Sequence, residues 1–288
     1  MDLLAYLTHL ATVYAMQLIL VGTLSFLLGG AGIFNLAHIA TVAVGAYASA
    51  LLTLRLGASF PLALLGAAGA GVLFGLFLAL LLRRLRSDHL ALLALSTSYL
   101  TTIVLLNWTS VTRGPFGLPG IVRPAALESP AMYLLVASVI AALVLAALAV
   151  VLRSPYGRVM AALRDDETAA LALGKRVGDV RMVVYLLSAG GAAVGGALLA
   201  HFLQFIDPAT FPLAMLGLAL SGAIVGGIGS IPGVLAGTAV VTFLPEALRF
   251  FIPSPSVAAP LRQLTFALLI IAVLIARPRG ISGRIDVQ

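Results

Sequence analysis

Long apolar stretches follow one another along this chain, separated by shorter polar segments. A helix needs about 20 mainly apolar residues to cross a bilayer, and the cores of these stretches carry no Asp, Glu, Lys or Arg. The pattern therefore predicts an all-α polytopic membrane protein with about eight or nine transmembrane helices, one or two of them broken or re-entrant. The stretches lie at residues 6–28, 33–54, 61–82, 89–107, 131–152, 182–203, 214–248 and 262–276.

Two glycine-rich segments interrupt these stretches and predict breaks in the corresponding helices. Residues 29–38 read GGAGIFNLAH and residues 226–233 read GGIGSIPG, so both segments contain GGxG. Helix breaks at corresponding places in two halves of a chain are typical of the central pathway of transporters. An internal duplication and a chance match in a glycine-rich chain both remain open. The predicted hinge residues are Gly29, Gly30, Gly32, Gly226, Gly227, Gly229 and Pro232.

The basic residues predict the orientation of the chain in the membrane. Lys and Arg are enriched in cytoplasmic loops, and twelve of the 17 basic residues gather in three places. We expect these places to face the cytoplasm, and the N-terminus to lie outside. The stretch 214–248 must then cross an even number of times, or dip in and return. The twelve are Arg83, Arg84, Arg86, Arg153, Arg158, Arg164, Lys175, Arg176, Arg181, Arg277, Arg279 and Arg284, and the outer five are Arg55, Arg113, Arg123, Arg249 and Arg262.

The composition excludes a water-soluble protein. Hydrophobic residues make up 61% of the chain and charged residues 9%, against about 25% charged in soluble domains. The net charge of +7 does not indicate nucleic acid, because the charges lie at the ends of apolar stretches rather than on one soluble face. We predict a single membrane domain over residues 1–288. Its first stretch is expected to be retained, since it lacks the basic flank of a signal peptide.

The charged block at 153–181 predicts two short cytoplasmic helices, and we name residues 154–180 the coupling segment because they join two apolar stretches. Ser154 followed by Pro155 is a typical helix start, which predicts a first helix over 156–163. A second helix over 167–173 has acids at its positive end, and Gly174 is a preferred residue just past a helix end. Asp179 is then expected to cap the next span.

Two functions are open for this coupling segment. Its basic residues would suffice for a connector that lies on lipid head groups. The acids at 165–167 favour a rigid knob that docks on a partner protein, because anionic lipid would repel them.

The chain lacks the features that drive transport against a gradient. A P-loop ATPase needs a glycine-rich loop ending in Gly-Lys-Ser or Gly-Lys-Thr, whereas the only lysine, Lys175, is followed by Arg176. Ion-coupled carriers hold ionisable groups at mid-membrane depth, which argues against that class here. We therefore predict that this chain is not an enzyme, and that a partner hydrolyses ATP.

An intramembrane hydrolase is the alternative from another class. Its nucleophile and base would be Ser221 and His201, but the glycine expected two residues before the serine is Ala219. His38 and His201 have no third ligand at suitable spacing, which argues against a metal site. We predict neither a metal nor a cofactor, and no catalytic residue.

Uncharged polar residues in the second and fourth stretches are candidates to line a translocation path. A zwitterionic solute needs transient hydrogen-bond partners and no charge that would trap it. Hydroxyl groups in membrane helices also bond to their own helix or bridge to a neighbour, and that alternative stays open. The candidates are Asn35, His38, Tyr47, Ser96, Thr97, Ser98, Thr101, Thr102 and Asn107.

Four segments together resemble the membrane permeases of bacterial ABC importers for branched-chain amino acids, especially their M-type subunit. They read NLAHIATVAVGAYASALL at 35–52, TRGPFGLPGI at 112–121, ALRDDETAALALGKRV at 162–177 and GGIGSIPGVLAG at 226–237. Two departures are that Gly174 follows Glu167 by seven residues rather than six, and that the outer loop 114–121 is shorter and more apolar than expected. The resemblance implies a multi-pass protein of the bacterial inner membrane that moves branched-chain or related amino acids by alternating access.

The resemblance also implies partners. These are two ATPase subunits, a homologous second permease or a second copy of this chain, a solute-binding protein and membrane lipid, with no nucleic acid. Amides, urea or another small polar solute remain the alternative substrates. The residues implied to couple to the ATPase are Arg164, Asp165, Asp166, Glu167, Ala170 and Gly174.

Overall fold

The computed structural model of the chain describes residues 3–82, 87–251 and a few positions between 264 and 282. Helices make up nearly all of the described fold. Within those residues, six helices are long and apolar enough to cross a membrane, or up to seven if a pair bent by 71° is one span. The six are α1 (Leu3–Ser25) with its π-helical end η1 (Phe26–Gly30), α2 (His38–Leu56), α3 (Phe60–Leu82), α6 (Pro130–Arg153), α9 (Val177–Leu203), and η4 (Pro208–Thr210) with α10 (Leu213–Gly226). The bent pair is Ala91–Asn107 of α4 (Ser87–Asn107) with Thr109–Phe116, which contains α5 (Thr109–Thr112) and η2 (Gly114–Phe116). A further apolar helix, α11 (Ile231–Phe251), follows α10.

The predicted all-α polytopic class is confirmed. The count of eight or nine spans exceeds the six or seven that the described residues contain, and the predicted span 262–276 lies mostly outside those residues. The stretch 214–248 does contain a break, because α10 ends at Gly226 and α11 begins at Ile231. The two helices pack against each other as a hairpin, which agrees with an even number of crossings.

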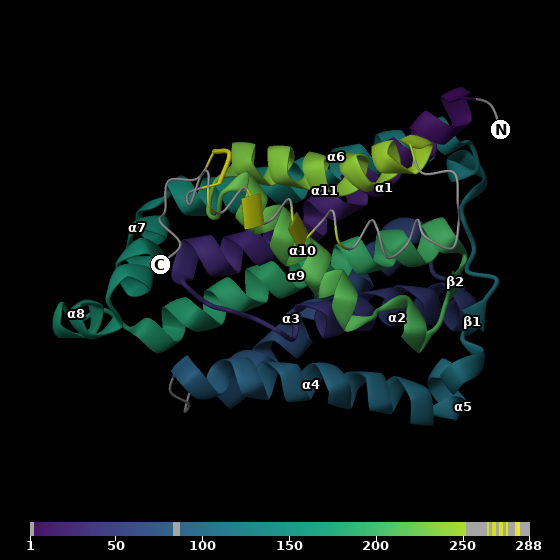
Figure 1. Ribbon diagram of the computed structural model, residues 1–288. Coiled ribbons are helices and arrows are strands. Elements are labelled where there is room, and N and C mark those ends of the chain that lie inside the picture. The colour runs from purple at the N-terminus through teal and green to yellow at the C-terminus, as the bar shows by residue number, and fades with distance from the viewer. Residues whose placement is uncertain are drawn as a thin grey trace.

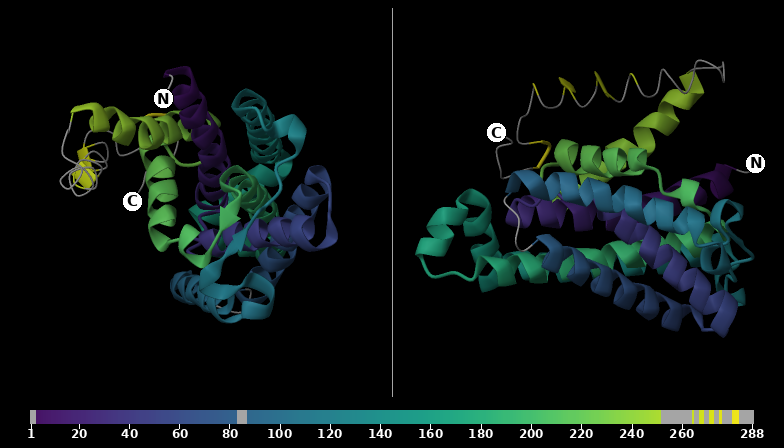
Figure 2. Two further views of the ribbon diagram at one scale, coloured as in Figure 1. Left: turned by 90° about the vertical axis from the view of Figure 1, so that its right-hand side faces the viewer. Right: turned by 90° about the horizontal axis from the view of Figure 1, so that it is seen from below.

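The helices run between two ends of different character (Figure 1). The inner end, as we call it, carries α7 (Pro155–Asp165) and α8 (Glu167–Ala172), which project beyond the bundle (Figure 2). The outer end carries β1 (Leu118–Pro119) and β2 (Phe205–Ile206), which pair antiparallel, and α1 begins there. The short helices η2 (Gly114–Phe116) and η3 (Ala125–Leu127) flank β1. This arrangement agrees with an N-terminus on the side opposite the coupling segment.

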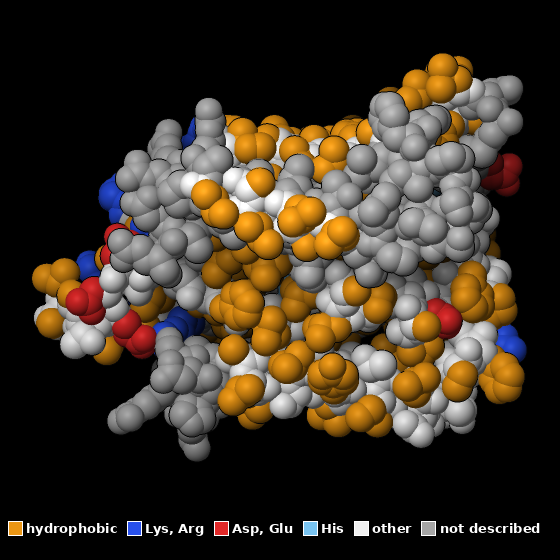
Figure 3. All heavy atoms as spheres, in the orientation of Figure 1, with side chains coloured by type: hydrophobic (Ala, Val, Ile, Leu, Met, Phe, Trp, Pro, Cys, Tyr) orange, Lys and Arg blue, Asp and Glu red, His pale blue; other side chains and the backbone are white. Residues whose placement is uncertain are grey.

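Charge and apolar surface are segregated along the same axis. Figure 3 shows hydrophobic side chains over the middle of the molecule, with Lys, Arg, Asp and Glu at the two ends. The basic residues of the coupling segment lie at the inner end, and Arg55, Arg113 and Arg123 lie at the outer end. The side chains of the predicted basic residues at 83–86, 249, 262, 277, 279 and 284 lie outside the described part.

Small residues bring three of the helices into close contact. A Cβ on Gly45 of α2 or on Gly71 of α3 would collide with Ala193 of α9. A Cβ on Gly196 of α9 would collide with the carbonyl group of Val42. In a membrane, apolar side chains gain little free energy by moving from lipid to a protein contact. Helix association therefore depends on close packing, which small residues allow.

Two helix starts differ from the sequence-based expectation. α2 begins at His38 rather than near residue 33, because residues 32–35 form no regular secondary structure and the Asn35 side chain accepts the Ala37 N–H at 3.0 Å, which forms a turn instead. α9 begins at Val177, with Arg176 at its cap position. The prediction that Asp179 caps this helix was therefore wrong: Asp179 lies in the first turn and pairs with Arg176 at 3.6 Å.

Candidate functional site

Local sequence signals build the two helices of the coupling segment. The Ser154 side chain accepts the backbone N–H groups of Tyr156 and Gly157, and Pro155 opens α7. The Asp166 side chain accepts two N–H groups at the start of α8. Past the end of α8, Gly174 has a left-handed φ of 71° and the Lys175 N–H bonds to the Ala170 carbonyl at 3.1 Å. These caps satisfy backbone groups that a short helix would leave exposed.

Side-chain contacts attach these helices to α9. Glu167 and Arg181 form an ion pair of 2.7 Å, and the Tyr156 hydroxyl donates to the Val180 carbonyl at 3.2 Å. Burial, and then the nearby Asp179 carboxylate, raise the pKa of Tyr156, so its hydroxyl stays protonated as a donor. The coupling segment is thus fixed to the first turns of the long helix α9.

The exposed tip of the coupling segment is apolar. Leu171 and Leu173 are 54% and 74% exposed, although α8 is otherwise built of small and polar residues. Our sequence analysis overlooked both leucines. The available signal was that both leucines stand in a charged block expected to lie outside the bilayer, where exposed apolar groups mark contact sites.

The coupling residues expected from the sequence have different surroundings in the fold. Arg164 points inward and donates to the Gly29 carbonyl at 2.8 Å, whereas Asp165 is largely exposed. Ala170 is buried. Asp166 and Gly174 shape the ends of α8, and Glu167 holds it to α9.

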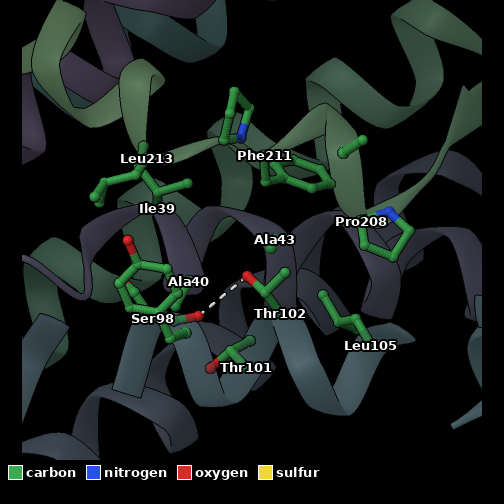
Figure 4. A pocket seen from close by; sticks show the side chains of 13 residues that line it. Ile39, Ala40, Ala43, Ser98, Thr101, Thr102, Leu105, Pro208, Phe211 and Leu213 are labelled. Carbon is green, nitrogen blue, oxygen red and sulfur yellow. Dashed lines mark hydrogen bonds between the residues drawn. The ribbon is translucent and has the colours of Figure 1, made fainter. Parts of the chain in front are cut away.

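A cavity of about 230 Å³ lies between α2, α4 and the η4–α10 segment. Figure 4 shows Ser98, Thr101, Thr102 and Leu105 of α4 on one side and Phe211, Leu213 and Pro208 on the other. The volume of this cavity exceeds the ~30 Å³ that one water molecule occupies in the liquid. Its lining is mainly apolar and holds no charged residue: Ile39, Ala40, Ala43, Ser98, Tyr99, Thr101, Thr102, Leu105, Pro208, Ala209, Phe211, Pro212 and Leu213.

The serine and threonine hydroxyl groups in this cavity donate to backbone carbonyls. Thr101 donates to the Thr97 carbonyl at 2.8 Å and Thr102 to the Ser98 carbonyl at 3.1 Å, both within α4. Ser98 donates to the Leu36 carbonyl at 2.8 Å and so links α4 to the turn before α2. Each hydroxyl oxygen retains acceptor capacity toward a solute.

The other residues predicted for the path do not line this cavity. His38 is buried and its Nε2 lies 3.1 Å from the Leu20 carbonyl. Tyr47 is buried behind Phe211, 6.3 Å between ring centroids, with no partner for its hydroxyl. Ser96, Thr97 and Asn107 bond to carbonyls of α4, and Asn35 forms the turn described above. The apolar lining residues, Phe211 above all, had no sequence signal that set them apart from lipid-facing residues.

Ser221 and His201 are engaged separately. Ser221 donates to the Gly217 carbonyl at 2.7 Å. The Nδ1–H of His201 donates to the Val122 carbonyl at 2.9 Å, so its Nε2 accepts from the Ser49 hydroxyl at 2.9 Å. This arrangement does not support a serine hydrolase. In the described part of the chain, no three His, Cys, Asp or Glu side chains gather as metal ligands.

The outer loop is anchored on the far end of α9. Arg123 donates to the Phe202 carbonyl at 2.6 Å and lies over the Tyr133 ring, 4.6 Å from its centroid. The N–H groups of Gly120 and Ile121 both donate to the Gln204 carbonyl. With the His201 bond to Val122, these contacts make the outer loop a fixed part of the bundle.

Comparison with known proteins gives one family. The family model described as "Branched-chain amino acid transport system / permease component" matches residues 6–275. The high-affinity branched-chain amino acid transport system permease protein LivM of Escherichia coli K12 is 29% identical over 303 residues, covering 94% of this chain and 69% of LivM. The permease protein LivH of Salmonella typhimurium is 29% identical over 276 residues, covering 89% of this chain and 88% of LivH. No solved structure shows significant similarity to this chain.

Proposed function

Because this chain belongs to the family of permease components of branched-chain amino acid transport systems, we propose that it is the membrane-spanning subunit of an ATP-driven importer. In this role, residues 1–288 act as one membrane domain that moves a branched-chain or related amino acid by alternating access. It is a multi-pass membrane protein, and transport requires that its cavity open to each side in turn.

ATP hydrolysis would take place in two partner subunits that bind the coupling segment. The sequence supports this division of labour, because it contains no P-loop and its single lysine stands outside any such motif. The apolar tip formed by Leu171 and Leu173 supports docking on a protein groove rather than on lipid head groups. An apolar anchor that fills a pocket contributes most of the binding energy at many interfaces.

The remaining partners would be a second permease and a solute-binding protein. Similarity to both LivM and LivH supports a pair of homologous permeases, of which this chain is one. A second copy of this chain could take the place of the other permease. The binding protein would deliver its solute at the outer end.

The cavity between α2, α4 and α10 is the proposed part of the translocation path. Phe211, Leu213 and Ile39 would contact an aliphatic side chain, while Thr101 and Thr102 would offer oxygen acceptors to the amino group. The lining contains no charge that would trap a zwitterion. Tyr47, whose hydroxyl is buried without a partner behind Phe211, would bind the solute when Phe211 moves.

The observation that carries the proposal is the exposed apolar tip of the coupling segment on a chain of this family. We expect Leu173→Asp to reduce co-purification of the ATPase subunits by about ten-fold, because a charge would enter an apolar interface. Leu56→Asp is the matched control: Leu56 is 75% exposed but lies at the outer end, so ATPase binding should be unchanged. Equal ATPase binding by both variants and the native chain would exclude docking through this tip.

The substrate class can be tested separately. In proteoliposomes that contain the complete transporter, unlabelled leucine, isoleucine and valine should compete with the uptake of labelled leucine, whereas urea and acetamide should not. The mainly apolar lining of the cavity favours these aliphatic amino acids over urea and acetamide. Absence of leucine uptake, together with uptake of labelled urea or acetamide, would assign the protein to the amide or urea class instead.

A further inference from the structure

The two glycine-rich breaks, about 200 residues apart in the chain, lie against each other at the inner end. A Cβ on Gly29 would collide with the backbone nitrogen and Cα of Gly229. Next to this contact, the Gly229 N–H donates to the Ser25 hydroxyl at 3.1 Å. The end of α1 and the turn between α10 and α11 therefore touch through backbone, with no flexible side chain between them.

The first break frees a carbonyl group for a contact from outside its helix. The last turn of α1 widens into η1, and the chain then reverses at Gly32, whose φ is +68°. The N–H groups of Gly32 and Ile33 return to the Leu28 and Leu27 carbonyls. The Gly29 carbonyl instead accepts Nη1 of Arg164 at 2.8 Å. Widened turns of this kind occur frequently at functional sites.

Arg164, in the last turn of α7, is held in place for this contact. Its Nε and Nη2 donate to the same Asp165 carboxylate oxygen at 2.9 and 2.7 Å. Its stem covers Gly32 so closely that a Cβ there would lie 3.1 Å from Arg164 Cγ. The Arg164 side chain is 23% exposed, whereas that of Asp165 is 67% exposed. A planar guanidinium can donate in both directions at once, which a lysine ammonium cannot reproduce in this geometry.

The second break is tied to a third segment. The N–H groups of Ile281 and Ser282 donate to the Val225 and Gly226 carbonyls at 3.0 and 2.9 Å. The Ser230 hydroxyl donates to the Ser282 carbonyl at 2.8 Å. The turn between α10 and α11 is thus held on two sides and has little freedom to move independently of Gly29.

From these contacts, we propose that Arg164 is a positioning residue that transmits movement of the coupling segment to both glycine breaks together. The inference rests on the proposed function, since it presupposes that a partner moves α7 and α8. A displacement of α7 pulls on the Gly29 carbonyl, and the backbone contact of Gly29 with Gly229 passes it to the α10–α11 hairpin. Close-packed groups transmit displacement because they cannot absorb it by compression.

The resemblance implied that Arg164 couples to the ATPase, either through direct contact with it or by transmitting its movement. In the fold Arg164 contacts the end of the first membrane helix at Gly29, which favours the second role. The two roles make different predictions. Loss of an ATPase contact would weaken assembly, whereas loss of a transmission contact would leave the complex intact and uncouple the two movements.

The test measures the two movements separately in the assembled transporter. The chain has no native cysteine, so spin labels can be attached at chosen sites, with Phe116→Cys at the outer end as the common reference of two distances. One label pair joins Phe116→Cys to Thr168→Cys, an exposed position in the first turn of α8, and the other joins Phe116→Cys to Leu235→Cys near the start of α11. Distances are compared without nucleotide and with ATP trapped in a hydrolysis-deficient ATPase.

In the native background, we expect ATP to change both distances. In Arg164→Gln the distance to position 168 should still change, the distance to position 235 should not, and uptake should fall about ten-fold with ATPase binding retained. The control Arg158→Gln loses the same charge from an exposed site on α7 and should behave as the native chain.

Each other result overturns the inference. If ATP changes both distances in Arg164→Gln, the Arg164 contact does not transmit movement, although the proposed function stands. If ATP changes neither distance in the native background, the coupling assignment itself fails. Should Arg164→Gln not assemble, Asp165→Ala decides, because its exposed site tolerates substitution and it releases one side of Arg164. In Asp165→Ala, ATP should still change the distance to the coupling segment but should change the distance to position 235 less than in the native chain. Native behaviour of that variant would exclude the proposal.

Discussion

At the scale of single residues, glycine positions differ sharply in what surrounds them. Gly226 and Gly217 both lie in α10, yet a Cβ on Gly226 would collide with the Gly233 carbonyl while one on Gly217 would meet nothing within 4 Å. The sequence cannot distinguish them, because both are glycines in an apolar stretch. The difference depends on where α11 returns, which is a long-range contact.

We therefore expect Gly226→Ala to destabilise the protein by about 1–3 kcal/mol, the usual cost of overpacking a close contact. Gly217→Ala should be neutral or slightly stabilising, since alanine favours helix more than glycine does. Thermal unfolding in detergent, followed by tryptophan fluorescence or by a dye that reports exposed apolar surface, measures both. Equal shifts in the two variants would show that α10 and α11 do not pack as described.

At the scale of elements, the coupling segment was predictable because its signals are local. Ser154, Pro155 and Gly174 act within a few residues of their own positions, and both helices form within two residues of the expected bounds. The start of α2 was not predictable from hydropathy. An apolar segment such as 33–37 satisfies the membrane whether or not its backbone is helical, provided that neighbouring groups such as Ser98 satisfy its carbonyls.

Two serines allow the capping contribution to be measured on matched elements. Ser154 precedes Pro155 at the start of α7 and caps it, whereas Ser129 precedes Pro130 at the start of α6 and makes no side-chain cap bond. We expect Ser154→Ala to cost about 1 kcal/mol locally. Hydrogen exchange at Tyr156 and Gly157 should then accelerate about five-fold. Ser129→Ala should leave the exchange at the start of α6 unchanged, and acceleration there by a similar factor would contradict the capping geometry.

The candidate path shows where sequence reasoning ends at the element scale. Ser98, Thr101 and Thr102 line the cavity, whereas Ser96, Thr97 and Asn107 of the same helix do not. All six carry polar side chains that bond to carbonyls. The rotation of α4 against α2 decides which of these side chains face the cavity. An apolar helix that faces lipid on one side carries no polar stripe from which this rotation could be predicted.

At the scale of the whole molecule, the two ends are expected to face opposite compartments. The positive-inside rule places the coupling segment in the cytoplasm, and the fold puts Phe116 and Leu173, both highly exposed, at opposite ends. Because the chain has no cysteine, Phe116→Cys and Leu173→Cys each provide one reactive thiol. A membrane-impermeant maleimide should label Phe116→Cys in intact spheroplasts that produce this chain without its ATPase subunits, and Leu173→Cys only after permeabilisation. The reverse pattern would invert the topology.

One helix is attached at both of these ends. α9 is an unbroken helix of 27 residues, which binds α8 through Arg181 near its first turn and carries the outer loop on the carbonyl groups of His201 and Phe202. A straight helix of that length measures about 40 Å, the thickness of a bilayer with its head groups. If α9 turns about its axis as a rigid body, the cytoplasmic and external faces must rotate in the same sense and at the same moment. Binding of a solute carrier at the external face and of nucleotide at the cytoplasmic face would then both act on the same rotation of α9.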